Sequence, residues 1–291
     1  MPKLVGDQDM SLPVFTRPRQ KPYGQLHDHH PDHSFRGVLG LWEKFKMAEV
    51  QESDSPFCWL GDPGGILLYD RDTLEWLSDQ QRYRVGLFAN PEPPINGRIN
   101  LPWTYWPRQT ALTQLYHTRK PFTYGQRPHG VAFVGGTGNR SQGSHRRMSY
   151  WSHACDLFRF GINRDPYTPE EYIRTLRLSR YGLCLRGYGT KCHREIECLA
   201  MGVVPILTPG VGLSYHNPLQ LGVHYLLARS VEEVRELARS VSMEQWGRMS
   251  EAGRRWYAEN ASPAGILKVT LEIGDGVKEK GCNATQVTLQ P

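Results

Sequence analysis

The sequence lacks the apolar runs that carry a chain into or through a membrane. Its first ten residues, MPKLVGDQDM, have no signal-peptide core, and no run approaches the roughly 20 apolar residues of a transmembrane helix. We therefore expect a soluble protein with no membrane span.

Cysteines with metal-site spacing are also missing. The six cysteines are scattered, and three of them fall inside elements that the sequence predicts to be buried. This usage favours a reducing, cytoplasmic compartment and gives no reason to expect a bound metal ion. They are Cys58, Cys155, Cys184, Cys192, Cys198 and Cys282.

The sequence has no internal repeat of solenoid length, no zinc-finger spacing and no basic tail. Lysine and arginine nevertheless exceed aspartate and glutamate by 35 to 29, which gives a net charge of +6 and an isoelectric point near 9.0. Because the basic residues are dispersed, the excess favours a small phosphorylated ligand over nucleic acid. At 291 residues, the chain is long enough for two domains.

The most informative stretch covers residues 181–208. Its pattern predicts a strand over 181–185, a glycine-broken turn over 186–190, a helix over 191–201 and a strand over 203–207. A helix N-terminus presents unpaired backbone N–H groups and the positive end of the helix dipole. The turn is therefore suited to a phosphate group.

Side chains around this turn can complete a nucleotide site. Gly187 and Gly189 allow a ligand to approach the backbone closely, and Glu197 is placed to accept hydrogen bonds from two vicinal hydroxyls, such as those of a ribose. The alternative is an ordinary α/β crossover with a solvated, charged helix face. The other residues expected at this site are Arg186, Tyr188, Thr190, Lys191, His193 and Arg194.

Arg194 and Glu197 form an R-x-x-E pattern, which is followed by Ala200, Gly202 and Pro205 before an apolar strand. This order resembles the nucleotide-sugar site of GT-B glycosyltransferases, most closely the exostosin-like family 47, which includes small virus-encoded members. The resemblance implies that Glu197 holds the donor ribose and that Arg194 contacts the diphosphate.

The resemblance is specific over residues 130–260, and the implied fold class is α/β. Strands and helices alternate on both sides of a proline-containing connection at 112–127, which fits the GT-B plan of two Rossmann-like domains facing across a cleft. A helix at 246–260 is expected to cross back onto the first domain. The expected boundaries are an extended arm over 1–25, an N-terminal acceptor-side domain over 26–125, a C-terminal nucleotide-sugar-binding domain over 126–273 and a polar tail over 274–291.

Two further segments are candidates for the donor side. A glycine-rich loop after a strand at 131–136 carries Arg140 and Arg147, and the resemblance places a donor-side arginine near them. Tyr215 follows the strand at 203–207, where loops line the donor pocket of GT-B proteins. The alternatives are a solvated loop and a plain turn.

The general base is expected in the N-terminal half. Asp62, in a glycine-rich turn after a strand at 57–60, is the preferred candidate, with a structural Asx turn as the alternative. Asp28 and His29, in the stretch HDHHPDH, are further candidates, with a polar loop as the alternative. The D-x-D triplet at 70–72 resembles the metal-binding signature of GT-A enzymes, but its last residue suits a helix N-cap, so we treat it as incidental.

The segment 90–108 is rich in aromatic residues, including Trp103, Tyr105 and Trp106. Aromatic rings stack on sugars and also fill protein cores. An acceptor-facing loop and core packing are both open at this stage.

Together these observations predict a glycosyltransferase that moves a sugar, such as xylose or a similar sugar, from a UDP-sugar to a hydroxyl of a glycan or glycoprotein. The resemblance implies inversion without a metal ion or another cofactor, in a host cytosol if the protein is virus-encoded. The alternatives are a GDP-sugar enzyme such as a fucosyltransferase, a non-catalytic nucleotide-sugar or glycan-binding module, and a basic nucleic-acid binder.

Overall fold

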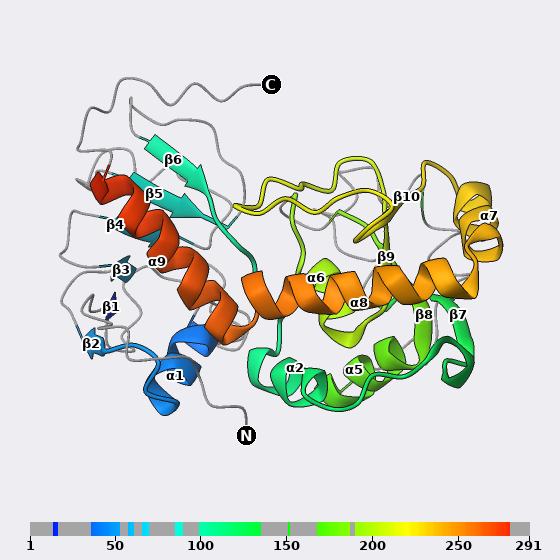
Figure 1. Cartoon of the computed structure of the whole chain (residues 1–291), viewed down its shortest axis with the longest axis horizontal. Coiled ribbons are helices and arrows are strands. Elements are labelled where there is room, and N and C mark those ends of the chain that lie inside the picture. The colour runs from blue at the N-terminus through cyan, green and yellow to red at the C-terminus, as the bar shows by residue number, and fades with distance from the viewer. Residues whose placement is uncertain are drawn as a thin grey trace.

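The computed structural model describes residues 14–16, 36–52, 58–60, 66–69, 85–89, 99–134, 151, 168–186 and 190–279. They form two α/β units that follow each other along the chain, each built on its own sheet (Figure 1). The predicted α/β fold class is therefore confirmed.

The first unit is built on a six-stranded mixed sheet of order β2-β1-β3-β4-β5-β6. Leu68, Leu87 and Leu101 are in register across the parallel strands β4, β5 and β6, whereas β3 is antiparallel to both β1 and β4. The strands are β1 (Val14–Thr16), β2 (Val50–Glu52), β3 (Cys58–Leu60), β4 (Ile66–Tyr69), β5 (Val85–Phe88) and β6 (Ile99–Pro102). Only its parallel half follows the expected Rossmann-like pattern, and β1 lies within the segment expected to be an extended arm.

The second unit contains a parallel sheet of order β10-β9-β8-β7. Its strands are β7 (His129–Ala132), β8 (Ser179–Cys184), β9 (Val204–Leu207) and β10 (Leu226–Leu227). Tyr181 and Leu183 of β8 pack in one hydrophobic cluster and Cys184 packs in another, because successive side chains of a strand point to opposite faces. Burial of both faces explains why this strand is a continuous apolar run in the sequence.

Several helices begin where the sequence places a cap. The side chains of Thr168, Ser230 and Ser242 each accept a hydrogen bond from the backbone N–H three residues later. The helices are α1 (Arg36–Lys44), α2 (Thr110–His117), α5 (Pro169–Arg177), α6 (His193–Met201), α7 (Val231–Ser240), α8 (Met243–Asn260) and α9 (Pro263–Glu279), and the 3-10 helix η2 covers Tyr124–Gln126.

Helix α1 ends at Lys44 because Lys46 adopts a left-handed backbone conformation (φ 52°), and β2 begins at Val50. Two other boundaries differ from the prediction. The connection expected at 112–127 contains most of α2. Helix α9 continues to Glu279, beyond the predicted start of the polar tail.

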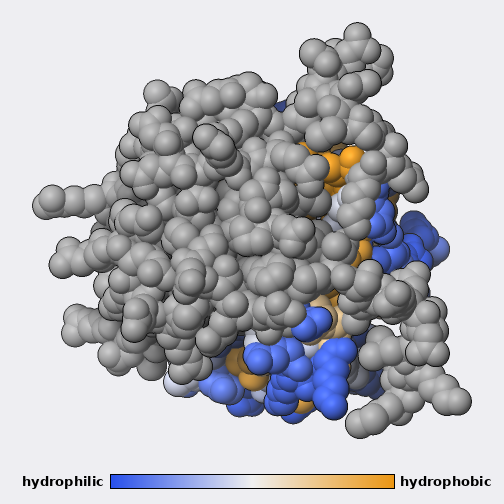
Figure 2. Space-filling view, turned by 90° about the vertical axis from the view of Figure 1, so that its left-hand side faces the viewer, coloured by the Kyte–Doolittle hydropathy of each residue, from blue (hydrophilic) through white to orange (hydrophobic). Residues whose placement is uncertain are grey.

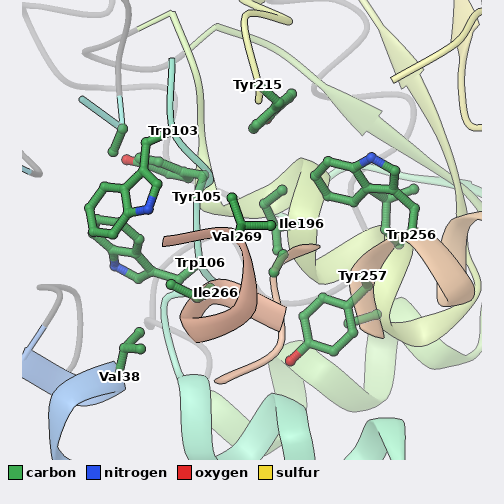
Figure 3. Close-up of a cluster of buried hydrophobic side chains, with 14 of the residues drawn as sticks. Val38, Trp103, Tyr105, Trp106, Ile196, Tyr215, Trp256, Tyr257, Ile266 and Val269 are labelled. Carbon is green, nitrogen blue, oxygen red and sulfur yellow. The ribbon is translucent and has the colours of Figure 1, made fainter. Parts of the chain in front are cut away.

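The two units share one hydrophobic core. In Figure 3 the aromatic side chains of the 103–106 segment meet side chains of α1, α6, α8 and α9. Trp42 donates from Nε1 to the carbonyl oxygen of Pro263 at 2.7 Å, and Trp103 donates from Nε1 to Thr270 Oγ1 at 2.9 Å. Helix α9 therefore extends the return contact with the first unit beyond the predicted segment 246–260, whose last residue, Asn260, accepts a hydrogen bond from the Thr104 hydroxyl through its carbonyl oxygen.

Part of the surface is visible in Figure 2, where hydrophilic described residues gather along the lower edge of the face with hydrophobic ones among them. The large hydrophobic side chains that are exposed include Phe45 and Leu115. Within the described ranges, no helix combines the length and apolar character needed to cross a membrane.

Candidate functional site

Helix α6 begins at the carboxyl edge of the parallel sheet, between β8 and β9. Its N-cap is Cys192, whose backbone N–H donates to Glu195 Oε1 at 2.8 Å, and it ends at Gly202, which adopts a left-handed conformation (φ 66°). The predicted order of strand, helix and strand is confirmed, although the helix begins at His193 rather than at Lys191. Residues 187–189 of the predicted turn lie outside the described residues. Ligands of open α/β sheets bind at this edge.

The loop 208–216 packs against the start of α6. The backbone N–H of Gly212 donates to the carbonyl oxygen of Thr190 at 2.8 Å, and Lys191 Nζ donates to the carbonyl oxygen of Ser214 at 2.7 Å. A Cβ atom on Gly212 would lie 2.6 Å from Thr190 Oγ1, so only glycine allows this close approach. The loop and the helix terminus therefore form one continuous surface.

Lys191 is only 2% exposed, and its ammonium lies 4.4 Å from the centroid of the Tyr215 ring. Burial lowers the pKa of Lys191 to about 7, although the nearby Glu195 opposes this effect. An anionic ligand at this position would stabilise the charged form of the lysine.

Six buried polar side-chain atoms around the start of α6 have no hydrogen-bond partner, whereas only two others occur in the described part of the chain. Buried polar groups are normally paired, so such a concentration marks a place where a polar ligand would supply partners. The six atoms are Arg186 Nε, Thr190 Oγ1, Arg194 Nη1, Glu195 Oε2, Ser214 Oγ and Tyr215 Oη.

Arg194 places a buried cation between the ends of β7 and β8. Its Nε donates to the carbonyl oxygen of Val134 at 3.1 Å, and its guanidinium lies 4.6 Å from the Phe133 ring centroid, which leaves Nη1 without a partner. Burial acts to lower the pKa of Arg194, but nearby groups, Tyr172 first among them, raise it above its ordinary value. Arg194 is therefore a permanent positive charge at this edge.

Glu197 is only 1% exposed, and both of its carboxylate oxygens are engaged. Oε1 accepts a hydrogen bond from the backbone N–H of Arg108 at 2.8 Å, and Oε2 accepts one from the hydroxyl of Tyr172. A ribose would have to displace or join these donors, so the ribose role of Glu197 stays a prediction.

The segment 103–108 covers the first turn of α6. His193 Nδ1 lies 2.8 Å from the carbonyl oxygen of Trp106, and its ring stacks on Tyr105 with centroids 4.9 Å apart. Burial lowers the pKa of His193 to about 4, so the ring is neutral and holds this segment instead of offering a charge to a phosphate. The rings of Trp103, Tyr105 and Trp106 are buried, which decides in favour of core packing.

Glu195 lies at the candidate site, although its position in the sequence did not predict this. It is fully buried, and burial raises its pKa to about 7, while its hydrogen bonds to backbone N–H groups and the charge of Arg194 act in the opposite direction. The only signal in the sequence is a second acid two positions before Glu197, and this position is equally suited to a helix cap.

The structure thus brings together Arg186, Thr190, Lys191, Arg194 and Tyr215 with Glu195, and it places Glu197 beside them in a buried position. The remaining candidates lie outside the described residues, as does the D-x-D triplet at 70–72. They are Asp28, His29, Asp62, Arg140, Arg147, Gly187, Tyr188 and Gly189.

Where the structure describes the chain, no group of three or more histidine, cysteine or acidic side chains is arranged to hold a metal ion. The basic side chains at the start of α6 are those of Arg194 and Lys191.

The chain matches no protein-family profile, and no curated protein is similar to it in sequence. Among solved structures, it is similar to an alpha-glucosyltransferase in complex with UDP-glucose and DNA containing an abasic site, with 11% identity over 72% of this chain and 71% of that chain and a TM-score of 0.48. A glycosyltransferase from Rickettsia africae ESF-5 shares 14% identity over 85% of this chain and 53% of that one, with a TM-score of 0.35. A sucrose-phosphate synthase from Thermosynechococcus elongatus shares 10% identity over 84% and 72%, with a TM-score of 0.39.

Proposed function

We propose that the chain is a glycosyltransferase that binds the diphosphate of a nucleotide sugar at the start of α6. The observation that carries the proposal is the cluster of six buried, unpartnered polar atoms at the carboxyl edge of the parallel sheet. A diphosphate accepts hydrogen bonds from several donors at once, and a helix N-terminus beside two basic side chains supplies such donors.

In this proposal Arg194 and Lys191 stabilise the negative charge that develops on the leaving diphosphate. Arg194 contributes a permanent cation with one free N–H group, and Lys191 becomes charged as the anion approaches. Glu195 Oε2 and Tyr215 Oη are the groups available to hydroxyls of the donor, and Glu197 is the ribose ligand by resemblance. Two cations at the leaving group make transfer without a metal ion the expected mechanism.

The acceptor side of the proposal rests on the resemblance to exostosin-like enzymes. A hydroxyl of a glycan or glycoprotein would attack the anomeric carbon with inversion, while Asp62, Asp28 or His29 takes the hydroxyl proton. UDP is the expected nucleotide and xylose or a similar sugar the transferred group. A reducing cytosol is the proposed compartment, and Cys184 and Cys198 are free thiols within this unit.

Calorimetric titration with UDP tests the site. We expect UDP to bind and Arg194→Met to weaken it by about 10- to 100-fold, the value of one or two charge-assisted hydrogen bonds. Arg127→Met is the matched control, because Arg127 is equally buried but binds carbonyls at the other end of α6. Equal UDP affinity in wild type and Arg194→Met would contradict the assignment of the diphosphate.

The donor class and the chemistry need separate measurements. A thermal-shift panel of UDP- and GDP-sugars identifies the nucleotide, and stronger stabilisation by GDP-sugars would favour the fucosyltransferase-like alternative. We expect transfer or slow donor hydrolysis to survive EDTA. Activity that is lost on chelation and restored by manganese would refute the metal-independent mechanism, and tight binding without any turnover would favour a non-catalytic module.

A further inference from the structure

Basic residues that are dispersed in the sequence gather on one face of the second unit. They come from the turn after α2, the last turns of α5 and the start of β8, and α2 and α5 lie along the lower side of this unit in Figure 1. Arg177 Nη2 donates to the carbonyl oxygen of Lys120 at 3.2 Å, which ties the segments together. We call this surface the arginine face, and it consists of Arg119, Lys120, Arg174, Arg177 and Arg180.

Guanidinium groups and aromatic rings alternate on the arginine face. Each ring is half-buried, and the guanidinium carbon of an arginine lies over it. The pairs are Arg119 over Tyr116 at 4.4 Å, Arg177 over Phe122 at 4.4 Å and Arg180 over Tyr124 at 4.2 Å from the ring centroid.

Among the described residues no acidic side chain forms an ion pair with this face, although Glu170 and Glu171 lie one turn before Arg174 on α5. The ion pairs found among the described residues are on α8 and α9, between Arg248 and Glu244 and between Lys268 and Glu272. Residues 93–155 contain no aspartate or glutamate, but they contain the basic residues Arg98, Arg108, Arg119, Lys120, Arg127, Arg140, Arg146 and Arg147. Uncompensated like charges cost stability, so a surface that keeps them is suited to an anionic partner.

Repulsion among these cations is visible in their ionisation. Burial and then the charge of Arg119 lower the pKa of Arg177. Burial lowers the pKa of Arg127 to about 9, and the charge of Arg177 contributes to this shift. A bound polyanion would relieve this repulsion.

We propose that the arginine face binds single-stranded nucleic acid. Arginine N–H groups match phosphate oxygens, and the outer faces of guanidinium groups stacked on rings offer planes on which bases stack. An anionic membrane fits less well, because the rings lie beneath the guanidinium groups and the large apolar side chain exposed beside them is Leu115, which is 52% exposed.

The arginine face and the nucleotide-sugar site lie at opposite ends of β8. Arg180 follows the first residue of this strand, whereas Cys184 ends it next to the start of α6. Five residue steps of a strand span about 17 Å. Nucleic acid on the arginine face would therefore leave the site at α6 accessible, and this inference does not rest on the proposed function.

Fluorescence anisotropy with a labelled single-stranded oligonucleotide tests the proposal on the full chain. The test variant is Arg119→Gln/Lys120→Gln/Arg180→Gln. The matched control removes three exposed cations on and beside α7 and is Arg229→Gln/Arg235→Gln/Arg239→Gln. Both variants lose the same charge, and thermal melting together with UDP titration checks that each is folded.

We expect wild type and control to bind the oligonucleotide and the test variant to lose affinity at least about tenfold. The slope of the logarithm of the binding constant against the logarithm of the salt concentration should become about 2 less steep, the value for three phosphate contacts on a single strand. Arg119→Lys/Arg180→Lys should keep the salt slope but lose affinity several-fold, because lysine has no plane for stacking. Equal losses in test and control variants would overturn the proposal, as would binding to anionic vesicles or heparin without binding to the oligonucleotide. Full affinity in the lysine variant would overturn the choice of a single strand.

Discussion

If a diphosphate binds at the start of α6 as proposed, the lowered pKa of Lys191 should make its affinity depend on pH. Because burial lowers its pKa to about 7 in the free protein, the side chain is largely neutral at pH 8. A bound diphosphate beside the ammonium would raise this pKa toward its ordinary value of about 10.4. Binding of UDP above pH 7 must then take up a proton.

The size of the effect follows from these two pKa values. At pH 8 about 0.9 proton should be taken up for each UDP bound, since only about a tenth of the lysine is charged beforehand. Affinity should fall about fivefold from pH 7 to pH 8 and about 50-fold from pH 7 to pH 9. The phosphate groups of UDP are already ionised in this range, because their last pKa is near 6.

Calorimetry in two buffers of different ionisation enthalpy measures the proton uptake directly. Lys191→Met should abolish it at pH 8 and flatten the affinity profile, with melting curves as the check on folding. Glu195, whose pKa is about 7, is the other group that titrates here, so Glu195→Gln separates its contribution. No proton uptake by wild type, or undiminished uptake by Lys191→Met, would refute the reasoning.

Two further predictions concern the ends of α6. Arg127 donates hydrogen bonds to three backbone carbonyls, including those of Ser179 and Met201. Arg127→Met should therefore lower the free energy of unfolding, measured by urea titration, by about 3 kcal/mol or more. A loss below about 1 kcal/mol would show that these hydrogen bonds do not stabilise the fold. Gly202→Ala forces alanine into a left-handed conformation and should lower the free energy of unfolding by about 1–3 kcal/mol. Gly247→Ala is the comparison, because Gly247 lies within α8 with open space around it, and this change should be neutral or stabilising. Equal effects of the two changes on stability would contradict this explanation.

Local sequence patterns predicted the elements that depend on local chemistry. The apolar run of β8, helix α6 and the proline-bearing strand β9 were placed to within two residues, because buried parallel strands and capped helices leave clear patterns.

Features that depend on distant contacts were not predictable from the same patterns. Glu197 looks like a free ligand in sequence, but Arg108 and Tyr172, far away in the chain, occupy its carboxylate. Helix α9 continues through Gly274 and Gly276 because its apolar side chains pack on the first unit, which overrides the low helix propensity of glycine. The arginine face joins residues that are about 60 positions apart, and no local window detects it.

The return of α9 to the first unit has a consequence for synthesis of the chain. Trp42 and Trp103 are among the first core residues to leave the ribosome, yet the groups to which they donate hydrogen bonds, on Pro263 and Thr270, are among the last. Domains usually fold in order as they emerge. Here the N-terminal unit cannot close its core until α9 has been translated, so its apolar surface would stay exposed while the second unit is synthesised and would be a natural target for a chaperone.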